Sequence, residues 1–209
     1  MDRWQDDLIG AVSGDSASER EVFECIQRAS RALGFQHVSY GFQAPLPLSR
    51  PKFTWLNDYP GDWQAHYMDA GYPAVDPRII RARQSSEPFI WNEALFSEVP
   101  ELWADLQARG IQHGWSQSTL HEPGGIGMLS LCRSTPITEQ DLQTRLQHMQ
   151  WLALLAHKAF SKLIRCCPRT RWISISGIPS TSWMFPTRPP RWFVPCCWGF
   201  SSSAPDGVS

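Results

Sequence analysis

The order of apolar and polar residues predicts helices and strands that alternate along the first 165 residues. Between Ser18, a helix-capping residue, and Gly34, a helix-ending one, apolar side chains recur at the spacing of one helix face: Val22, Phe23, Ile26, Ala29 and Leu33. Apolar and polar residues then alternate over residues 38–42, which indicates a strand, and residues 52–57 are typical of a second one.

The middle of the chain has the same alternation of elements. Helices are predicted over residues 59–71, 76–83 and 102–110, because each has a Pro near its start or a Gly at its end. Asp76-Pro77 is typical of a helix cap followed by Pro at the first helical position. Between the last two helices, residues 89–91 form a short apolar run that predicts a strand.

A hairpin and a long helix complete this part of the chain. Residues 114–120 and 126–133 are predicted strands joined by a Pro-Gly-Gly turn. Thr138 followed by Asp141 resembles a capping box, and it precedes a helical apolar stripe that continues to residue 165. The pattern therefore predicts an α/β fold in which an antiparallel sheet carries helices on both faces.

Composition divides the chain into unlike segments. The 209 residues carry a net charge of −1, but residues 1–165 hold 19 of the 20 acidic and 15 of the 19 basic side chains. Residues 166–209 hold four of the six Cys and four of the eleven Trp, and their seven Pro interrupt any helix or central strand. We divide the chain into an N-terminal extension with a first helix (1–17), a folded domain (18–165) and a tail (166–209), which we interpret as out-of-frame translation or a disordered tail.

The same numbers narrow the class of protein. A near-zero net charge argues against a protein that coats nucleic acid or an anionic membrane. The start of the chain has three Asp and no apolar run, which is unlike a secretory signal, and no stretch approaches the roughly 18 apolar residues of a membrane span. With Cys25 and Cys132 as reduced thiols in apolar patterns, we expect a cytoplasmic protein.

Conventional catalytic motifs do not occur in the sequence. It contains no GxSxG, Walker loop, HExxH or GxGxxG. His113 and His121 lie eight residues apart on one predicted strand with no third ligand nearby, so we expect no metal site. We therefore predict that the protein is not an enzyme and needs no cofactor.

Residues 59–91 contain many aromatic side chains, and Asp76 is the acid that we expect to lie among them. Apolar walls with a few convergent polar groups are typical of a small-ligand pocket, and a carboxylate there can accept a hydrogen bond from an amide N–H. The expected ligand is neutral and mostly apolar, with an amide and carbonyls. On the residues alone, the alternative is that Trp63 and Tyr67 belong to the core and Asp76 only caps its helix.

Several separated elements resemble the autoinducer-binding domain of LuxR-type quorum-sensing regulators. Trp63, Tyr67, Asp76-Pro77, Trp91 and Gly114 match that family's signature, as do the surrounding segments YGFQAPLPLSRPK, NDYPGDWQAHYMDAGYPAVDP, PFIW and GMLSLCRS. The resemblance covers residues 18–165. It implies an α/β/α sandwich on a five-stranded antiparallel sheet, and an N-acyl-L-homoserine lactone as the ligand.

The resemblance also implies roles for individual residues. Trp63 would donate to the lactone carbonyl, Tyr59 to the amide carbonyl, and Asp76 would accept from the amide N–H. Ser130 would reach an acyl oxygen, and Trp91 would pack against the lactone ring. The cavity would be lined by Tyr67, Gly41, Phe42, Leu106, Ile111 and Ser116. On this reading, Asp76→Ala abolishes the response to lactone and leaves the secondary structure intact.

The tail departs from that family. LuxR-type regulators continue into a helix-turn-helix, whereas residues 166–209 contain neither Lys nor Glu and no basic recognition-helix pattern. We therefore expect no DNA binding by this chain and no membrane association. It would act as a sensor that forms a homodimer, or as an inhibitor in mixed dimers with an intact relative. The alternatives are a full regulator whose sequence contains an error and, with less support, a lactone or amide hydrolase.

Overall fold

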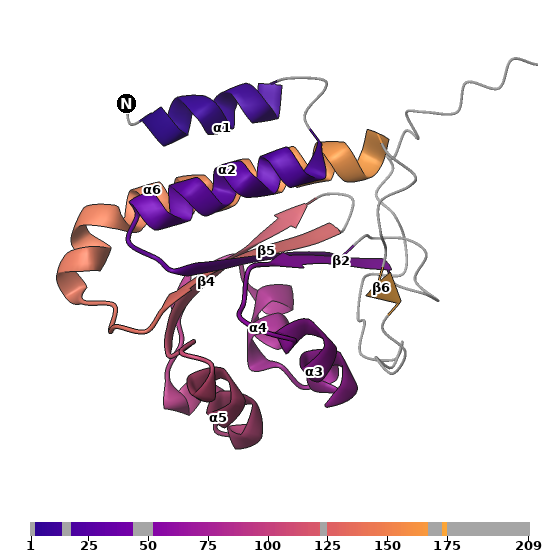
Figure 1. Cartoon of the computed structure of the whole chain (residues 1–209), viewed down its shortest axis with the longest axis vertical. Coiled ribbons are helices and arrows are strands. Elements are labelled where there is room, and N and C mark those ends of the chain that lie inside the picture. Colours follow the sequence, from indigo (N-terminus) through magenta and orange to yellow (C-terminus); the bar gives the residue numbers. More distant parts are fainter. Residues whose placement is uncertain (1–2, 14–17, 44–51, 122–124, 167–172, 175–209) are drawn as a thin grey trace, which may run out of the picture. The chain divides into compact units, whose positions relative to one another are not determined.

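One six-stranded antiparallel sheet organises the protein in a computed structural model (Figure 1). The structure describes residues 3–13, 18–43, 52–121, 125–166 and 173–174. The strand order is β3-β4-β5-β1-β2-β6. The strands are β1 His37–Gln43, β2 Lys52–Asn57, β3 Phe89–Ile90, β4 His113–His121, β5 Gly125–Arg133 and β6 Ile173–Ser174.

Helices cover both faces of the sheet (Figure 1). On one face lie α1 (Arg3–Ser13), α2 (Glu19–Ala32) and α6 (Glu139–Cys166). On the other lie α3 (Trp63–Asp69), α4 (Pro77–Gln84) and α5 (Pro100–Ala108), with two single-turn 3-10 helices, Tyr72–Ala74 and Glu93–Phe96. The α/β/α sandwich is confirmed, and its five expected strands are present together with a two-residue sixth strand from the tail.

Local sequence explains where these helices begin. Ser18 and Glu21 form a reciprocal capping box at the start of α2. Thr138 and Asp141 do the same for α6, since each side chain accepts from the other residue's backbone N–H. Asp76 caps α4 by accepting from the backbone N–H of Arg78 at 2.8 Å, with Pro77 at the first helical position.

Strand β1 shows how the two faces differ. Val38, Tyr40 and Phe42 point into the core beneath α2 and α6, where the Tyr40 ring stacks on Phe160 with centroids 4.6 Å apart. The intervening Ser39 and Gly41 line a pocket on the opposite face. The period-two alternation of a strand therefore gives the apolar residues to one layer and the small and polar residues to the other.

A second, mostly aromatic cluster lies beneath the α3–α5 face of the sheet. Its buried members are Tyr59, Trp63, Tyr67, Tyr72, Phe89, Trp91, Phe96, Leu102, Leu106, Ile111 and Cys132. Gly114 permits this packing, because a Cβ atom there would lie 2.2 Å from Cδ2 of Trp91. This close approach gives a physical reason for the glycine that is part of the family resemblance.

Three expectations from the sequence concern the tail, a membrane span and a metal site, and the described residues bear on each only in part. Apart from Cys166 and β6, the tail of residues 166–209 lies outside the described residues. Within the described part of the chain, no helix is long and apolar enough to cross a membrane. The described residues also contain no group of three His, Cys, Asp or Glu side chains placed to bind a metal ion.

Candidate functional site

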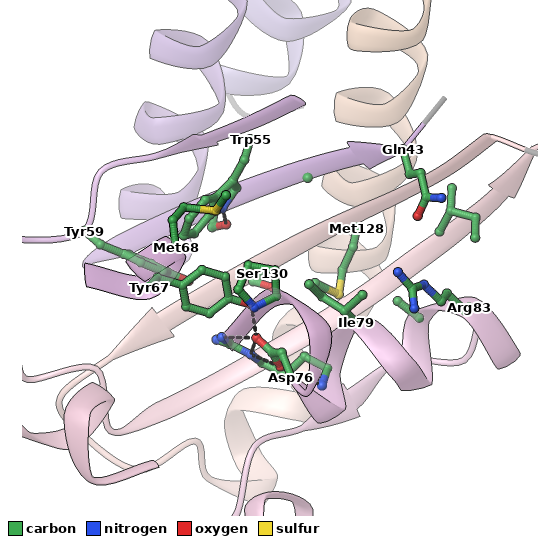
Figure 2. Close-up of a pocket in the computed structure, with 16 residues that line it drawn as sticks. Gln43, Trp55, Tyr59, Tyr67, Met68, Asp76, Ile79, Arg83, Met128 and Ser130 are labelled. Carbon is green, nitrogen blue, oxygen red and sulfur yellow. Dashed lines mark hydrogen bonds and ion pairs between the residues drawn. The ribbon is translucent and has the colours of Figure 1, made fainter. Parts of the chain in front are cut away.

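A pocket lies between the sheet and the α3–α4 layer (Figure 2). Strands β1, β2 and β5 form its floor, and α3, α4 and the segment between them form its wall. Its cavity volume is about 50 Å³. Its lining consists of Ser39, Gly41, Gln43, Trp55, Tyr59, Tyr67, Met68, Pro73, Asp76, Arg78, Ile79, Ala82, Arg83, Ile126, Met128 and Ser130.

Three serines from adjacent strands form a row that begins in the floor of the pocket and continues beyond it along the sheet. Ser39, Ser130 and Ser116 are register partners on β1, β5 and β4. Two indoles close the ends of the row: Trp55 donates to Ser39 Oγ at 2.7 Å, and Trp91 donates to Ser116 Oγ at 2.8 Å. Ser116 and Ser130 share a hydrogen bond of 2.7 Å. Small hydroxyl side chains here leave room above the sheet and supply polar contacts to whatever fills it.

Asp76 is the polar centre of the pocket wall, and it is 1% exposed. Tyr67 donates its hydroxyl to Asp76 Oδ2 at 2.6 Å. Arg78 donates from its backbone N–H and Nε to Oδ1, at 2.8 and 2.9 Å, and from Nη2 to Oδ2 at 2.5 Å. Asp76 therefore caps α4 and also lines the pocket, so the two alternatives that the sequence left open do not exclude each other.

The buried guanidinium of Arg78 is a site group that the sequence analysis missed. Its side chain is 6% exposed, and its guanidinium carbon lies 4.5 Å from the centroid of the Trp91 ring. Burial by itself would lower the pKa of Arg78, but the charge of the Asp76 carboxylate and its hydrogen bonds outweigh this effect. The pKa of Arg78 is therefore raised above its usual value, and the guanidinium is charged. The sequence offered no signal for it, because arginines in the first turn of a short helix are mostly exposed.

Two buried donors beside the pocket lack a well-formed hydrogen bond. Among the described residues, the Trp63 indole N–H and the Tyr59 hydroxyl have no partner at hydrogen-bond geometry. The Cys132 thiol and the Ser39 hydroxyl are near enough to the Tyr59 hydroxyl to influence its pKa. Burial raises the pKa of Tyr59 well above its usual value, so the phenol keeps its proton and can donate. An unpaired buried polar group costs about 1–3 kcal/mol, so both are suited to a ligand that brings acceptors.

A polar network packs against Trp63 on the side of α5. Asp105 accepts from the Tyr72 hydroxyl and pairs with His66 Nε2, both at 2.6 Å. These hydrogen bonds lower the pKa of the Asp105 carboxyl. Arg109 places its guanidinium carbon 5.0 Å from the centroid of the Trp63 ring, which fixes the indole from the side facing α5.

The structure separates the residues expected at the site into three groups. Tyr59, Tyr67, Asp76, Gly41 and Ser130 line the pocket. Trp63, Trp91 and Ser116 do not line it but contact residues that do. Leu106 and Ile111 belong to the aromatic cluster and not to the lining.

Phe42 is a correction to the expected site. Its ring lies in the core under α6, with its centroid 5.9 Å from that of His157, so it faces away from the pocket. Gly41 does line the pocket, and consecutive residues of one strand point to opposite faces. Expecting both Gly41 and Phe42 in one cavity was therefore inconsistent with the strand predicted for them.

The pocket has further lining residues that the sequence did not reveal. Trp55 and Met128 extend the apolar wall, while Gln43 and Arg83 lie at the end of the pocket opposite Tyr59 (Figure 2). Strand alternation could have indicated Met128, since it shares a face with Ser130. Arg83 lies on α4 one turn and a half after Arg78, and only the packing of α4 against the sheet places both beside the pocket.

The chain is similar in sequence to regulators of transcription. A family model described as the autoinducer binding domain matches residues 18–160. The transcriptional activator protein AnoR of Acinetobacter nosocomialis is 34% identical over 167 residues, which cover 78% of this chain and 70% of AnoR. The transcriptional activator protein SolR of Ralstonia nicotianae is 33% identical over 70% of this chain and 62% of its own length.

Solved structures share the fold. CepR2 of Burkholderia cenocepacia, titled an N-acylhomoserine lactone dependent LuxR family transcription factor, has a TM-score of 0.65 at 28% identity, and the match covers 78% of this chain and 94% of CepR2. SdiA in complex with octanoyl-rac-glycerol has a TM-score of 0.64 at 26% identity, over 80% of this chain and 67% of SdiA. The match to the curated activators therefore spans between three fifths and seven tenths of their length.

Proposed function

Because the chain belongs to the autoinducer-binding domain family of LuxR-type regulators, we propose that its pocket binds an N-acyl-L-homoserine lactone. The relatives named above are transcriptional regulators and not enzymes. The ligand would lie between the sheet and the α3–α4 layer, with its acyl chain over the floor formed by β1 and β5. Under this proposal the domain senses a small diffusible signal.

The observation that carries the proposal is the pair of buried donors that lack a well-formed hydrogen bond. Trp63 Nε1 and the Tyr59 hydroxyl are both buried, and both belong to the aromatic cluster that borders the pocket. A lactone carbonyl and an amide carbonyl are the two acceptors that would satisfy them. A site built around such groups rejects analogues that lack them, because the protein's own polar atoms would stay unpaired.

The remaining groups fit the same ligand. Asp76 is the single carboxylate of the lining and would accept from the amide N–H. Ser130, in the middle of the serine row, lies opposite Ser39 and would contact an acyl oxygen. Gly41, Met128 and Ile126 border the apolar part of the floor, where each buried CH₂ of the acyl chain contributes about 0.8 kcal/mol.

The proposal is tested by removing one donor without changing the fold. Trp63→Phe keeps an aromatic ring but has no N–H. We expect its affinity for N-octanoyl-L-homoserine lactone, measured by isothermal titration calorimetry, to fall by about 10- to 100-fold, the equivalent of roughly 1–3 kcal/mol. Trp115→Phe is the matched control, because Trp115 is buried in the core of the opposite face.

Two results would contradict the proposal. One is the absence of any lactone binding by the unaltered protein. The other is an equal affinity of Trp63→Phe and Trp115→Phe for the lactone, which would remove the indole N–H from the site. Mass spectrometry of the recovered ligand should find the lactone ring and the amide intact, as expected of a sensor and not of a hydrolase.

Asp76→Ala is a poor test of the same site. Asp76 is the ion-pair partner of Arg78, which is itself buried. Removing one partner of a buried pair leaves an uncompensated charge and costs about 3–5 kcal/mol. We therefore expect this substitution to destabilise the fold, in contrast to the intact secondary structure expected from the sequence alone.

The proposal extends to assembly and to the tail. We propose that the domain dimerises through α6, where Leu154 is 55% exposed, and that it forms inactive mixed dimers with an intact relative. Analytical ultracentrifugation of the protein with lactone tests dimerisation, and a reporter strain that expresses an intact relative tests inhibition. Translating the gene downstream of codon 165 in the other two frames tests whether a helix-turn-helix was lost by a frameshift.

A further inference from the structure

The carboxylate of Asp76 has no capacity left for a ligand. A carboxylate offers about four lone-pair sites on its two oxygens. Asp76 already accepts five contacts, from the Tyr67 hydroxyl and from the backbone N–H, Nε and Nη2 of Arg78, with Nε shared between both oxygens. An amide N–H can reach this carboxylate only if one of these donors leaves.

The guanidinium of Arg78 is the donor able to leave. The backbone N–H is fixed by the cap of α4, and Tyr67 is held on α3 within the aromatic cluster. The guanidinium stands at the end of a flexible side chain, and its Nε and Nη2 converge with the Tyr67 hydroxyl on Asp76. Its departure would free two or three acceptor sites and leave the helix cap intact.

The same guanidinium occupies a stacking surface. Its carbon lies 4.5 Å from the centroid of Trp91 and 5.7 Å from that of Phe96. The family resemblance implies that the lactone ring packs against Trp91, and that ring is of similar size to a guanidinium. With a cavity volume of about 50 Å³, the pocket is far smaller than the roughly 300–1,000 Å³ of small-molecule sites, so a side chain must move before such a ligand fits.

We propose that the Arg78 side chain occupies the part of the pocket where the ligand's amide and lactone ring would bind. The ligand displaces its guanidinium from Asp76 and from Trp91. This inference rests on the proposed function. A ligand gains full access only if it replaces both interactions, with an N–H for Asp76 and a ring that packs on Trp91. Arg78 therefore lowers the affinity for every ligand and selects against acyl compounds that lack an amide or a ring.

Replacing the arginine should strengthen binding. Arg78→Met keeps an unbranched side chain and removes every guanidinium donor. Because it leaves Asp76 without its ion-pair partner, we expect it to lower stability, and its affinity is measured under conditions where circular dichroism shows the variant folded. A protein whose binding-competent state is a small fraction of the population binds more weakly by that fraction. We expect the dissociation constant of Arg78→Met for N-octanoyl-L-homoserine lactone to fall at least about tenfold below that of the unaltered protein, by isothermal titration calorimetry.

Arg81→Met is the matched control. It makes the same change of charge on the same helix, but Arg81 is exposed and packs over Phe89, outside the pocket lining. We expect its dissociation constant to stay within about twofold of the unaltered protein. A folded Arg78→Met protein that binds no more tightly than this control overturns the exchange, and weaker binding assigns Arg78 to direct contact with the ligand. Absence of binding in all three proteins instead overturns the proposed function.

A second measurement does not depend on the stability of a variant. In ¹⁵N-labelled unaltered protein, the Nε–H of Arg78, which donates to Asp76 at 2.9 Å, should exchange slowly with water. Its resonance is assigned by its loss in Arg78→Lys. At a lactone concentration that saturates the calorimetric titration, we expect this resonance to shift and its exchange to accelerate. A resonance that keeps its position and its slow exchange at saturation overturns the proposal.

Discussion

The two faces of one sheet differ in how the hydroxyl group of a buried tyrosine is hydrogen-bonded. Beneath α2 and α6 the core is mostly aliphatic and aromatic, and the Tyr40 hydroxyl shares a hydrogen bond of 3.0 Å with His157 Nδ1. Beneath α3–α5, Tyr59 and Trp63 are also buried, but neither makes a well-formed hydrogen bond among the described residues, and a charged pair lies in the wall of a cavity. The first arrangement stabilises the fold, whereas the second, under the proposed function, keeps interactions available for a ligand.

The difference shows that burial alone does not identify a functional residue. Tyr40 is 1% exposed and Tyr59 is 8% exposed, so both would count as core. They are distinguished by the hydrogen bond that one makes and the other lacks. Each of the following substitutions is chosen to separate stability from affinity across the sheet.

The largest effect is expected from Phe160→Ala, on the α6 face. Phe160 is 1% exposed and stacks on Tyr40, so its truncation should lower the free energy of unfolding by about 3–5 kcal/mol. Urea denaturation followed by circular dichroism measures this change. Under conditions where the variant is folded, the dissociation constant for the lactone should be unchanged. A selective loss of affinity without loss of stability would contradict the division between the two faces.

A smaller and sharper effect is expected from one chemical change made on both faces. Tyr40→Phe should lower the free energy of unfolding by about 1 kcal/mol, because it removes the partner of His157, and should leave lactone affinity unchanged. Tyr59→Phe should leave stability unchanged or raised, because it removes an unpaired hydroxyl, and should weaken lactone binding about tenfold. Denaturation and calorimetry on both variants provide the test, and equal effects on both faces would refute the comparison.

The smallest effect is expected from the acid end of the pH range. The backbone N–H of Thr138 and the Arg133 guanidinium, both donating to Asp141 near the start of α6, lower the pKa of that carboxyl to about 2. Because the folded value lies below the unfolded value of roughly 3.9, this contribution to stability is complete above pH 4 and is lost as the pH falls toward 2.

Asp141→Asn should therefore flatten the dependence of stability on pH in that range, and should cost less than about 1 kcal/mol at pH 7. Thermal melting between pH 2 and pH 7 measures the effect. Glu139→Gln serves as the control, since Glu139 lies in the same helical turn but makes no contact with Arg133. A variant whose stability falls with acid as steeply as that of the unaltered protein would contradict the assignment.

Most of the fold could be predicted from the order of residues. The caps at Ser18, Asp76 and Thr138 place the starts of α2, α4 and α6, and the alternation over residues 38–42 places β1. These signals succeed because capping and strand alternation depend on neighbours within a few residues. The two-residue strand β6 was not predicted, because its pairing with β2 joins segments far apart in the sequence.

The site could be predicted only in part. Asp76, Tyr59, Tyr67, Gly41 and Ser130 were expected at the pocket and line it. The sequence could not show that the serine row lies between Trp55 and Trp91, since the row consists of three serines on three different strands. Phe42 does not line the pocket, because the alternation of the strand turns its side chain to the opposite face of the sheet.

The sequence by itself determined the class of the fold, the family and the kinds of group that would meet the ligand. The tertiary structure decided which of these groups are already satisfied and which are not. Asp76 and Arg78 are two residues apart in the sequence, yet their pairing gains its significance from Trp91, which comes from a different segment and lies beneath the guanidinium. Interactions between neighbouring residues can be inferred from their order, but the contents of a cavity depend on side chains that only packing brings together.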